Sequence, residues 1–363
     1  MSKSKTGNSK GSRRLRSMLL GTVLLAVTAM VLPLSGYVWS AAHAEDQVKQ
    51  STMAAADKAE TDSANARADY WREVRGSSPG YSAVQGQETD VLIQSGGETW
   101  RQIRNGPVAK IGALMVLGMI VALLAYQLLV GGAKLETRTG RKILRWPATD
   151  RIVHWFTAIL FIIQAITGLS LLWGRSVLIP VFGKEGFAAF AGFAKPVHDY
   201  LALPFTFGLA VMLVMWVKHN IPRAYDLEWF KKAGGYFSGE HPPAGFANAG
   251  EKAYFWVLAL AGTALVASGF YLLFPNFGFE RSAMQNANII HNVSALILVT
   301  TVFAHIYLGT LGSEGALEGM LTGEVDEGWA RQHHNVWLEG LESGKELPTR
   351  EAETTGRSAT AST

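Results

Sequence analysis

The sequence predicts an all-α membrane protein, on the basis of its composition, the length of its apolar runs and the placing of its basic residues. The chain has 363 residues, of which 48% are hydrophobic and only 17% are charged. The hydrophobic residues are gathered into long blocks, and about 20 consecutive apolar residues are needed to span a bilayer. The basic residues stand beside these blocks, where they orient membrane helices. The net charge of +4 is therefore not interpreted as a nucleic-acid surface.

The chain contains no cysteine. This excludes disulfides, iron–sulfur clusters held by thiolates, and covalently attached c-type haem, which requires a Cys-x-x-Cys-His sequence. Any redox centre on this chain must therefore be held by histidine or methionine.

The N-terminal segment has the order of a secretory signal. Six basic residues precede an apolar stretch that starts at Met18, and Ala42-His43-Ala44 forms a small-x-small cleavage site. We predict a signal peptide over residues 1–44, with an uncleaved anchor as the alternative because the apolar stretch is long enough for either. Residues 45–106 are rich in Ala, Ser, Gly, Asp and Glu. They are predicted to be periplasmic and partly disordered, serving as a subunit contact or a linker.

Five further apolar blocks have the length of a membrane-spanning helix. They are Ile111–Val130, Ile152–Trp173, Tyr200–Val217, Tyr254–Phe274 and Ile289–Leu311. The segments after the first and third blocks carry 11 Lys and Arg residues, whereas the segments after the second and fourth carry 4. Because cytoplasmic loops collect positive charge, we predict that the N-terminal segment lies outside and the tail inside. The cytoplasmic tail is predicted to cover residues 313–363, and its polar part, residues 332–363, is expected to fray.

Four of the nine histidines lie within or at the ends of apolar blocks: His154, His198, His291 and His305. Of the other five, His43 is predicted to leave with the signal peptide, and His219 is predicted to lie at the membrane interface or cap a helix. The remaining three are predicted to be solvated: His241, His333 and His334. An imidazole inside a membrane needs a polar partner, and none of these blocks offers an Asp, Glu, Lys or Arg near its middle.

The spacing of His291 and His305 suggests what these imidazoles bind. Fourteen residues displace the second ring by about 21 Å along a helix and return it to within about 40° of the first. With the predicted orientation, His291 can meet His198 on the outer side, and His305 can meet His154 on the cytoplasmic side. One helix then supplies one axial ligand to each of two stacked b-type haems. A non-haem metal site and a polar helix interface are the alternatives.

Small residues near these histidines leave room for a flat macrocycle between helices. Gly168 lies on the helix of His154, and Gly208 follows His198. Membrane helices also use small residues for ordinary packing, so this observation supports haem only weakly.

Residues from about 140 to 340 resemble the gamma subunits of membrane-bound formate dehydrogenases, which are di-haem cytochromes b556. The matching stretches are DRIVHWFTAILF, VHDYLALPFTFG, KHNIPRAYDLEWF, NAGEKAYFW, the helix with the last two membrane histidines, and GMLTGEVDEGWARQHHNVW. The resemblance implies a four-helix di-haem cytochrome b bundle over residues 140–312. It pairs His198 with His291 near the periplasm and His154 with His305 near the cytoplasm. Residues 107–131 form an extra N-terminal transmembrane helix that shorter relatives lack.

The resemblance also implies a quinone pocket at the cytoplasmic end, formed by Asn248, Gly250 and Glu251. Family members often have glutamine at the position of Glu251. A carboxyl group there can deliver protons to a reduced quinone, which an amide cannot do. The alternative is an interfacial acid that begins a helix, where it suits the helix dipole.

The function implied by the resemblance is that of a membrane anchor and electron carrier in the bacterial inner membrane. The chain would receive electrons from an iron–sulfur beta subunit, which is served by a molybdenum or tungsten pterin alpha subunit, and would itself hold no formate-oxidising site. Two haem b groups would pass electrons to menaquinone or ubiquinone in anaerobic respiration and contribute to the proton motive force. The alternatives are the cytochrome b subunit of a membrane-bound hydrogenase, a non-redox anchor and a transporter. A transporter would be expected to have carboxylates in mid-membrane and broken helices, and neither is evident in the sequence.

Overall fold

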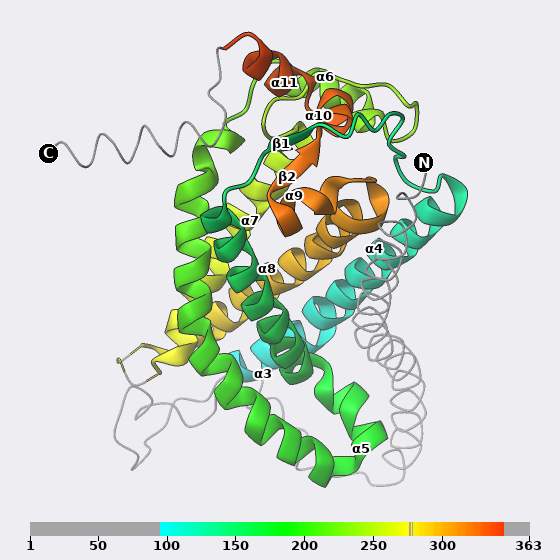
Figure 1. The fold of residues 1–363 in the computed structure, drawn as a ribbon. Helices are drawn as coiled ribbons and strands as arrows, with labels where there is room; N and C mark the ends of the chain where they lie inside the picture. Colours follow the sequence, from blue (N-terminus) through cyan, green and yellow to red (C-terminus); the bar gives the residue numbers. More distant parts are fainter. Residues whose placement is uncertain (1–94, 276, 278, 345–363) are drawn as a thin grey trace, which may run out of the picture. The chain divides into compact units, whose positions relative to one another are not determined.

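The computed structural model describes residues 95–344, except 276 and 278, and this part of the chain is mainly helical (Figure 1). The signal peptide and residues 45–94 of the predicted outer segment lie outside the described residues. The elements, in chain order, are α3 (Ser95–Ile103), η1 (Arg104–Val108), α4 (Ala109–Leu129), β1 (Lys142–Leu144), α5 (Ala148–Trp216), η2 (Val217–Asn220), α6 (Asp226–Lys231), η3 (Ala233–Gly235), α7 (Ala249–Leu273), α8 (Arg281–Tyr307), η4 (Leu308–Gly312), α9 (Ala316–Thr322), β2 (Glu324–Asp326), α10 (Glu327–His333) and α11 (Asn335–Glu342).

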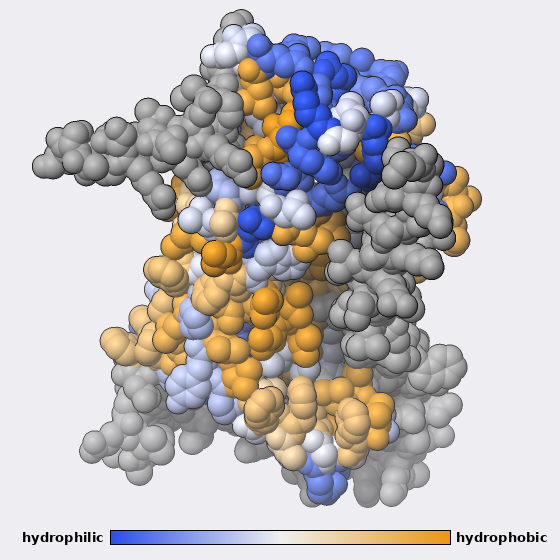
Figure 2. Space-filling view, viewed as in Figure 1, coloured by the Kyte–Doolittle hydropathy of each residue, from blue (hydrophilic) through white to orange (hydrophobic). Residues whose placement is uncertain are grey.

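Four helical stretches within the described residues are long and apolar enough to cross a membrane. They are Thr99–Leu129, Ala148–Asn220, Ala249–Leu273 and Arg281–Gly312. Hydrophobic residues cover the long helices, and hydrophilic residues gather over the end that bears α6, α10 and α11 (Figure 2). The predicted all-α membrane fold is therefore confirmed.

Helix α5 contains two of the predicted spans and breaks at a glycine. Gly183 has φ 72° and ψ 177°, a backbone conformation that residues with a Cβ rarely adopt. The two arms of α5 fold back on each other: Trp216 Nε1 donates to Asp150 Oδ1 at 2.6 Å, and Gln164 Nε2 donates to the carbonyl of His198 at 2.9 Å. The loop expected between these spans is helical instead, apart from Gly183.

The hairpin of α5 is held by apolar packing close to these hydrogen bonds. Leu160, Phe205, Leu209 and Met212 form a buried cluster between the two arms. A Cβ built on Gly208 would lie 2.6 Å from Thr157 Oγ1, so this glycine allows the two arms to approach closely. Gly208 therefore serves helix packing, which is the plainer of the two interpretations of the small residues.

The end of α4 is attached to α8 and to the loop after α6. Tyr126 donates its hydroxyl hydrogen bond to the carbonyl of Tyr236 at 2.9 Å, and Tyr307 donates to Gln127 Oε1 at 2.7 Å. Directly after α4, the amide of Ala133 donates to the carbonyl of Gly312 at 2.8 Å. The C-terminal end of α4 is thus joined to the end of α8 and to η4 by side-chain and backbone hydrogen bonds.

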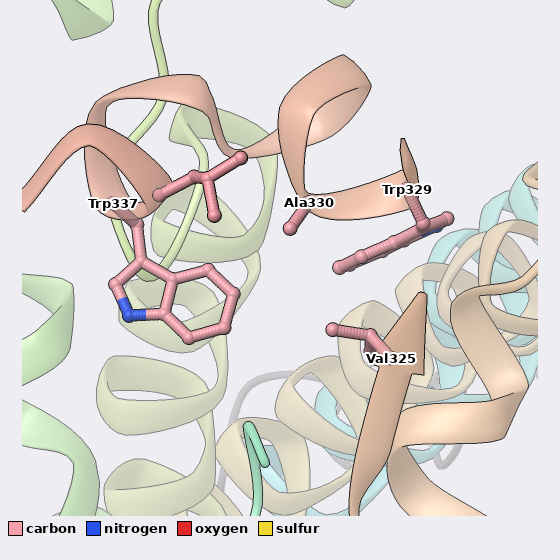
Figure 3. Packing of buried hydrophobic residues seen from close by; sticks show 5 residues of the cluster. Val325, Trp329, Ala330 and Trp337 are labelled. Atoms are coloured by element: carbon pink, nitrogen blue, oxygen red, sulfur yellow. The ribbon is translucent and has the colours of Figure 1, made fainter. Parts of the chain in front are cut away.

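Residues 313–344, called here the C-terminal cap, are folded, so the expectation that residues 332–363 fray is wrong for residues 332–344. Val325, Trp329, Ala330, Trp337 and Leu338 form a buried apolar cluster, and Ile143 and Phe246 pack against it (Figure 3). Strands β1 and β2 pair antiparallel beside this cluster. The sequence is polar on average here, but a tryptophan buries about 150–250 Å². Two tryptophans are therefore enough to anchor a short segment that looks hydrophilic.

Asp326 ties the C-terminal cap to the segment before β1. Its carboxylate accepts hydrogen bonds from the backbone amides of Thr139 at 3.0 Å, Gly140 at 2.9 Å and Gly328 at 2.9 Å, and the residue is 3% exposed. Burial alone would raise the pKa of this carboxyl group, but the three amide donors outweigh that effect and lower the pKa below its usual value.

We predict that Asp326→Asn lowers the free energy of unfolding by about 1–3 kcal/mol at pH 7, because an amide N–H would then face backbone N–H donors in a buried site. Since the folded-state pKa is depressed, the stabilisation is full above the ordinary value of 3.8 and is lost as the pH falls through the lower folded-state pKa. Thermal unfolding in detergent at pH 7 and at acid pH measures both effects.

The matched control is Glu324→Gln on the same strand. It is expected to change stability by less than about 0.5 kcal/mol. Equal stability of wild type and Asp326→Asn at pH 7 would contradict the role given to Asp326.

Candidate functional site

Helices α5 and α8 bring the four membrane histidines together in two pairs. The imidazole centroids of His154 and His305 are 6.1 Å apart, and those of His198 and His291 are also 6.1 Å apart. In each pair α8 supplies one ring and one arm of α5 supplies the other. The two pairings expected from the spacing are therefore present as neighbours, while ligation by these residues stays a prediction.

The separation within each pair suits a metal held between two imidazoles. Two metal–nitrogen bonds of about 2 Å place the ligating nitrogens about 4 Å apart. Each ring centre lies further from the metal than its ligating nitrogen, so centroids about 6 Å apart agree with ligation from both sides. Bis-imidazole ligation of this kind is typical of low-spin haem, and the donor set therefore fits haem b.

Helix α7 orients His291 in its pair with His198. The Nδ1 atom of His291 lies 3.0 Å from the carbonyl oxygen of Leu265, and a carbonyl only accepts hydrogen bonds. Nδ1 must therefore carry the proton, which leaves Nε2 with the lone pair that a metal requires. One turn further along α7, a Cβ built on Gly269 would lie 3.3 Å from Cε1 of His291. Gly269 therefore leaves space for the imidazole ring of His291, because a larger side chain would crowd it.

Aromatic side chains hold the pair formed by His154 and His305. The ring of His305 stacks on Tyr254 with centroids 4.5 Å apart and an interplanar angle of 9°. His154 stacks against Trp216 at 6.2 Å and 25°. The Nδ1 atom of His154 is buried without a hydrogen-bond partner in the described part of the chain. Sequence reasoning missed Tyr254 and Trp216, since the contacts depend on the register between helices.

The three residues expected at the quinone pocket meet in the first turn of α7. Asn248 Oδ1 accepts from the amide of Glu251 at 2.9 Å, and Glu251 Oε2 accepts from the amide of Asn248 at 2.9 Å, which is a capping box. Gly250 lies against the ring of Trp229, where a Cβ would come within 2.7 Å. The helix-start interpretation of Glu251 is thus observed, and the quinone contact stays a prediction.

Arg145 is the counterion of Glu251. Its Nη2 atom lies 3.2 Å from both carboxylate oxygens and donates to the carbonyl of Phe246 at 2.7 Å. The arginine side chain is 4% exposed, and its guanidinium carbon lies 4.9–5.4 Å from the rings of Trp146, Phe246 and Trp329. Cation–π contacts and the ion pair together compensate for its loss of hydration.

From the sequence alone, Arg145 counts only among the positive loop charges that orient the membrane helices. Its three aromatic neighbours lie far apart in the sequence, so no local sequence pattern predicts that Arg145 is buried among them. The nearest available signal is the tryptophan directly after it in the sequence, Trp146.

His334 belongs to the same cluster, and the expectation that it is solvated is wrong. It is 0% exposed, its Nδ1 atom lies 2.7 Å from the carbonyl oxygen of Gly245, and its Nε2 atom lies 4.0 Å from Glu251 Oε2. Burial, followed by the positive charge of Arg145, lowers the pKa of His334 to about 3. The ring is therefore neutral at physiological pH.

The neighbouring His333 is also largely shielded. Burial, followed by the nearby His241, lowers the pKa of His333 to about 4. It lines a small cavity of about 10 Å³ together with Asn248, Tyr236 and Trp229. That volume holds about one water molecule. His241, by contrast, is 34% exposed and pairs with Glu136, in agreement with a solvated residue.

Comparison with known proteins identifies the domain that carries the histidine pairs. The chain is 28% identical over 211 residues to the cytochrome b556(Fdn) subunit of the nitrate-inducible formate dehydrogenase of Escherichia coli K12, covering 56% of this chain and 94% of that protein. It is also 28% identical over 211 residues to the formate dehydrogenase cytochrome b556 subunit of Haemophilus influenzae, covering 56% and 86%. A third relative, the cytochrome b556(fdo) subunit of E. coli formate dehydrogenase, is 28% identical over 199 residues.

The family match covers residues 145–323 and is described as prokaryotic cytochrome b561. That range includes all four membrane histidines, both arms of α5, and helices α7 and α8. The part of this chain that carries the histidine pairs is therefore similar to the prokaryotic cytochrome b561 family.

Proposed function

We propose that this chain is the cytochrome b subunit of a formate dehydrogenase, anchoring the complex in the membrane and carrying electrons through two haems to quinone. The observation that carries the proposal is that the four membrane histidines form two pairs. In each pair the ring centroids are 6.1 Å apart, and α8 supplies one of the two rings. The names of the relatives supply the catalytic partner.

The protein's contribution is to hold four imidazoles at two depths. Haem b bound at each pair would supply reversible one-electron iron chemistry. His291 is kept in the ligating tautomer by the carbonyl of Leu265, and the rings of Tyr254 and Trp216 fix the inner imidazoles. The 14 residues between His291 and His305 separate the two pairs by about 21 Å along α8, so the two sites lie under opposite leaflets of the bilayer.

The outer pair, His198 and His291, would face an iron–sulfur beta subunit that is served by a molybdenum or tungsten pterin alpha subunit. This chain has no cysteine with which to hold a cluster itself. The inner pair would face menaquinone or ubiquinone at the start of α7, where Asn248, Gly250 and Glu251 meet. Moving one charge inward is worth about 2.3 kcal/mol per 100 mV of membrane potential, so the arrangement contributes to the proton motive force.

The orientation follows from the loop charges. The loops after the first and third spans, residues 131–151 and 218–253, carry 11 Lys and Arg residues, whereas the loops after the second and fourth spans carry 4. The N-terminal segment is then periplasmic in the bacterial inner membrane, and the C-terminal cap is cytoplasmic. This places Glu251, Arg145 and His334 on the side from which a reduced quinone would take its protons.

Replacing one histidine of each pair should remove one haem at a time. We expect His198→Ala and His154→Ala each to lower the haem content from two to one per polypeptide, because each deletes an axial ligand of a different site. The pyridine haemochrome assay measures the content, and a redox titration shows whether the remaining haem differs between the two variants.

His241→Ala is the matched control for these variants, because it removes a histidine outside the membrane domain and should leave both haems in place. Two haems retained in both His198→Ala and His154→Ala would rule out the assigned ligands.

The electron donor can be identified in native membranes. We expect formate to reduce most of the b-type haem of this chain that dithionite reduces, and hydrogen to reduce little of it. The measurement is a reduced-minus-oxidised spectrum, compared with that of membranes from a strain lacking this chain. Reduction by hydrogen but not by formate would favour the cytochrome b subunit of a membrane-bound hydrogenase instead.

A further inference from the structure

Helix α6 has its polar and apolar faces reversed relative to a helix on the surface of a water-soluble protein. Its carboxylate points inward: Asp226 is buried and accepts a hydrogen bond from Lys252 Nζ at 2.8 Å. Its apolar residues Leu227 and Phe230 point outward, with 62% and 52% of their surface exposed. These two residues are three positions apart and therefore lie on one face of the helix. An apolar environment outside α6 would account for this reversal.

Exposed apolar side chains continue on both sides of α6. Together they are called here the apolar strip, which consists of Ile221, Leu227, Phe230 and Phe237. The strip begins directly after the membrane-length stretch Ala148–Asn220. Its other end touches α4, since the ring centroids of Phe237 and Tyr126 are 5.5 Å apart. The strip therefore connects the ends of two stretches that can span a membrane.

The buried ion pair of α6 shows at which depth the strip lies. Lys252 Nζ donates to both carboxylate oxygens of Asp226, at 2.8 and 2.9 Å, and Lys252 belongs to the first turn of α7. The span Ala249–Leu273 begins with the same turn. Helix α6 therefore lies beside the start of a span, where lipid headgroups meet acyl chains.

The exposed charge around the strip is positive. Of the three acids in residues 217–240, Asp226 is paired with Lys252, and the other two share Lys232. The remaining basic residues are exposed and form no ion pair within the part of the chain that the structure describes: Lys218, Arg223 and Lys231. An apolar surface bordered by such cations matches the chemistry of an anionic membrane surface.

We propose that the apolar strip and its three basic neighbours form a binding surface for anionic phospholipids of the leaflet beside α6. The apolar side chains enter the acyl region, and the long aliphatic stems of Lys218, Arg223 and Lys231 let their charges reach the phosphate groups. A protein partner fits this surface less well, because the cores of protein interfaces are depleted in lysine. The proposal requires neither haem nor quinone, so it does not depend on the proposed electron transfer.

Because the chain has no cysteine, a single engineered thiol can report on this surface. The test uses the full-length chain with Phe230→Cys, labelled with the fluorophore NBD, at one copy per phosphatidylcholine nanodisc. An equal fraction of the lipid carries a nitroxide quencher high on its acyl chain, either as phosphatidylglycerol or as phosphatidylcholine. We expect both lipids to quench the label. Phosphatidylglycerol should quench about threefold more efficiently or better, because each basic side chain near an anionic surface favours binding by about fivefold.

Removing the charges should abolish this preference without removing the strip from the membrane. Adding Arg223→Gln and Lys231→Gln to the labelled chain should equalise quenching by the two lipids, while quenching by phosphatidylcholine persists. Salt at about 1 M, where the Debye length is about 3 Å, should have the same effect on the chain that keeps both charges. The matched control is Arg331→Gln, which removes an exposed arginine of α10 that is paired with Glu327. It should leave the preference unchanged.

Two further label positions complete the experiment. Leu227→Cys carries the label on the same face of α6 and should behave as Phe230→Cys does. Glu339→Cys places it at an exposed position of α11 and should be quenched by neither lipid. Absence of quenching at both strip positions would show that α6 faces water or a protein. Equal quenching by the two lipids in the chain with all its charges would show insertion without headgroup selection. Either result overturns the proposal.

Discussion

Paired imidazoles between apolar helices are the constraint on which the rest of this membrane domain depends. A histidine ring buried among hydrocarbon side chains needs a partner for each nitrogen. Nδ1 of His291 donates to the carbonyl of Leu265, whereas Nδ1 of His154 has no hydrogen-bond partner among the described residues. Aromatic faces cover His305 and His154. The hairpin of α5 then brings the opposite ring of each pair to α8, so one break at Gly183 serves both sites.

Much of this arrangement could be predicted because it follows from helical periodicity. The spacing of His291 and His305 on one helix fixes their relative direction and depth, and neither quantity depends on what packs against the helix. The same reasoning predicted the membrane spans, whose length is set by the bilayer. It did not find the helical continuation through residues 174–199, because a helix that ends in a tight reversal and a loop have similar composition.

The C-terminal cap could not be predicted, for a different physical reason. Its stability comes from contacts between segments that are far apart in the sequence, such as Trp337 with Phe246 and Asp326 with Thr139. Average polarity describes such a segment poorly, because a few large aromatic residues supply most of the buried apolar area. His334 was misjudged together with the segment around it, since a histidine in a polar stretch gives no local sign of burial.

The carboxylate of Glu251 is best understood through the cation that it neutralises. A glutamine at this position could still accept a hydrogen bond from Arg145 and complete the capping box, so neither contact by itself requires a charge. The guanidinium, however, is 4% exposed and would then be a buried cation with only aromatic faces and one carbonyl as compensation. Because the Glu251 side chain is 41% exposed, water would replace part of its interaction with Arg145, and losing the carboxylate should cost less than the about 3–5 kcal/mol typical of a fully buried pair.

With glutamine at position 251, the buried arginine would lose its carboxylate counterion and would have to be more hydrated. In this chain the acid allows Arg145 to stay dry between three aromatic rings. The same acid completes the capping box at the start of α7. The burial of the cation and the start of α7 therefore both depend on the side chain at position 251.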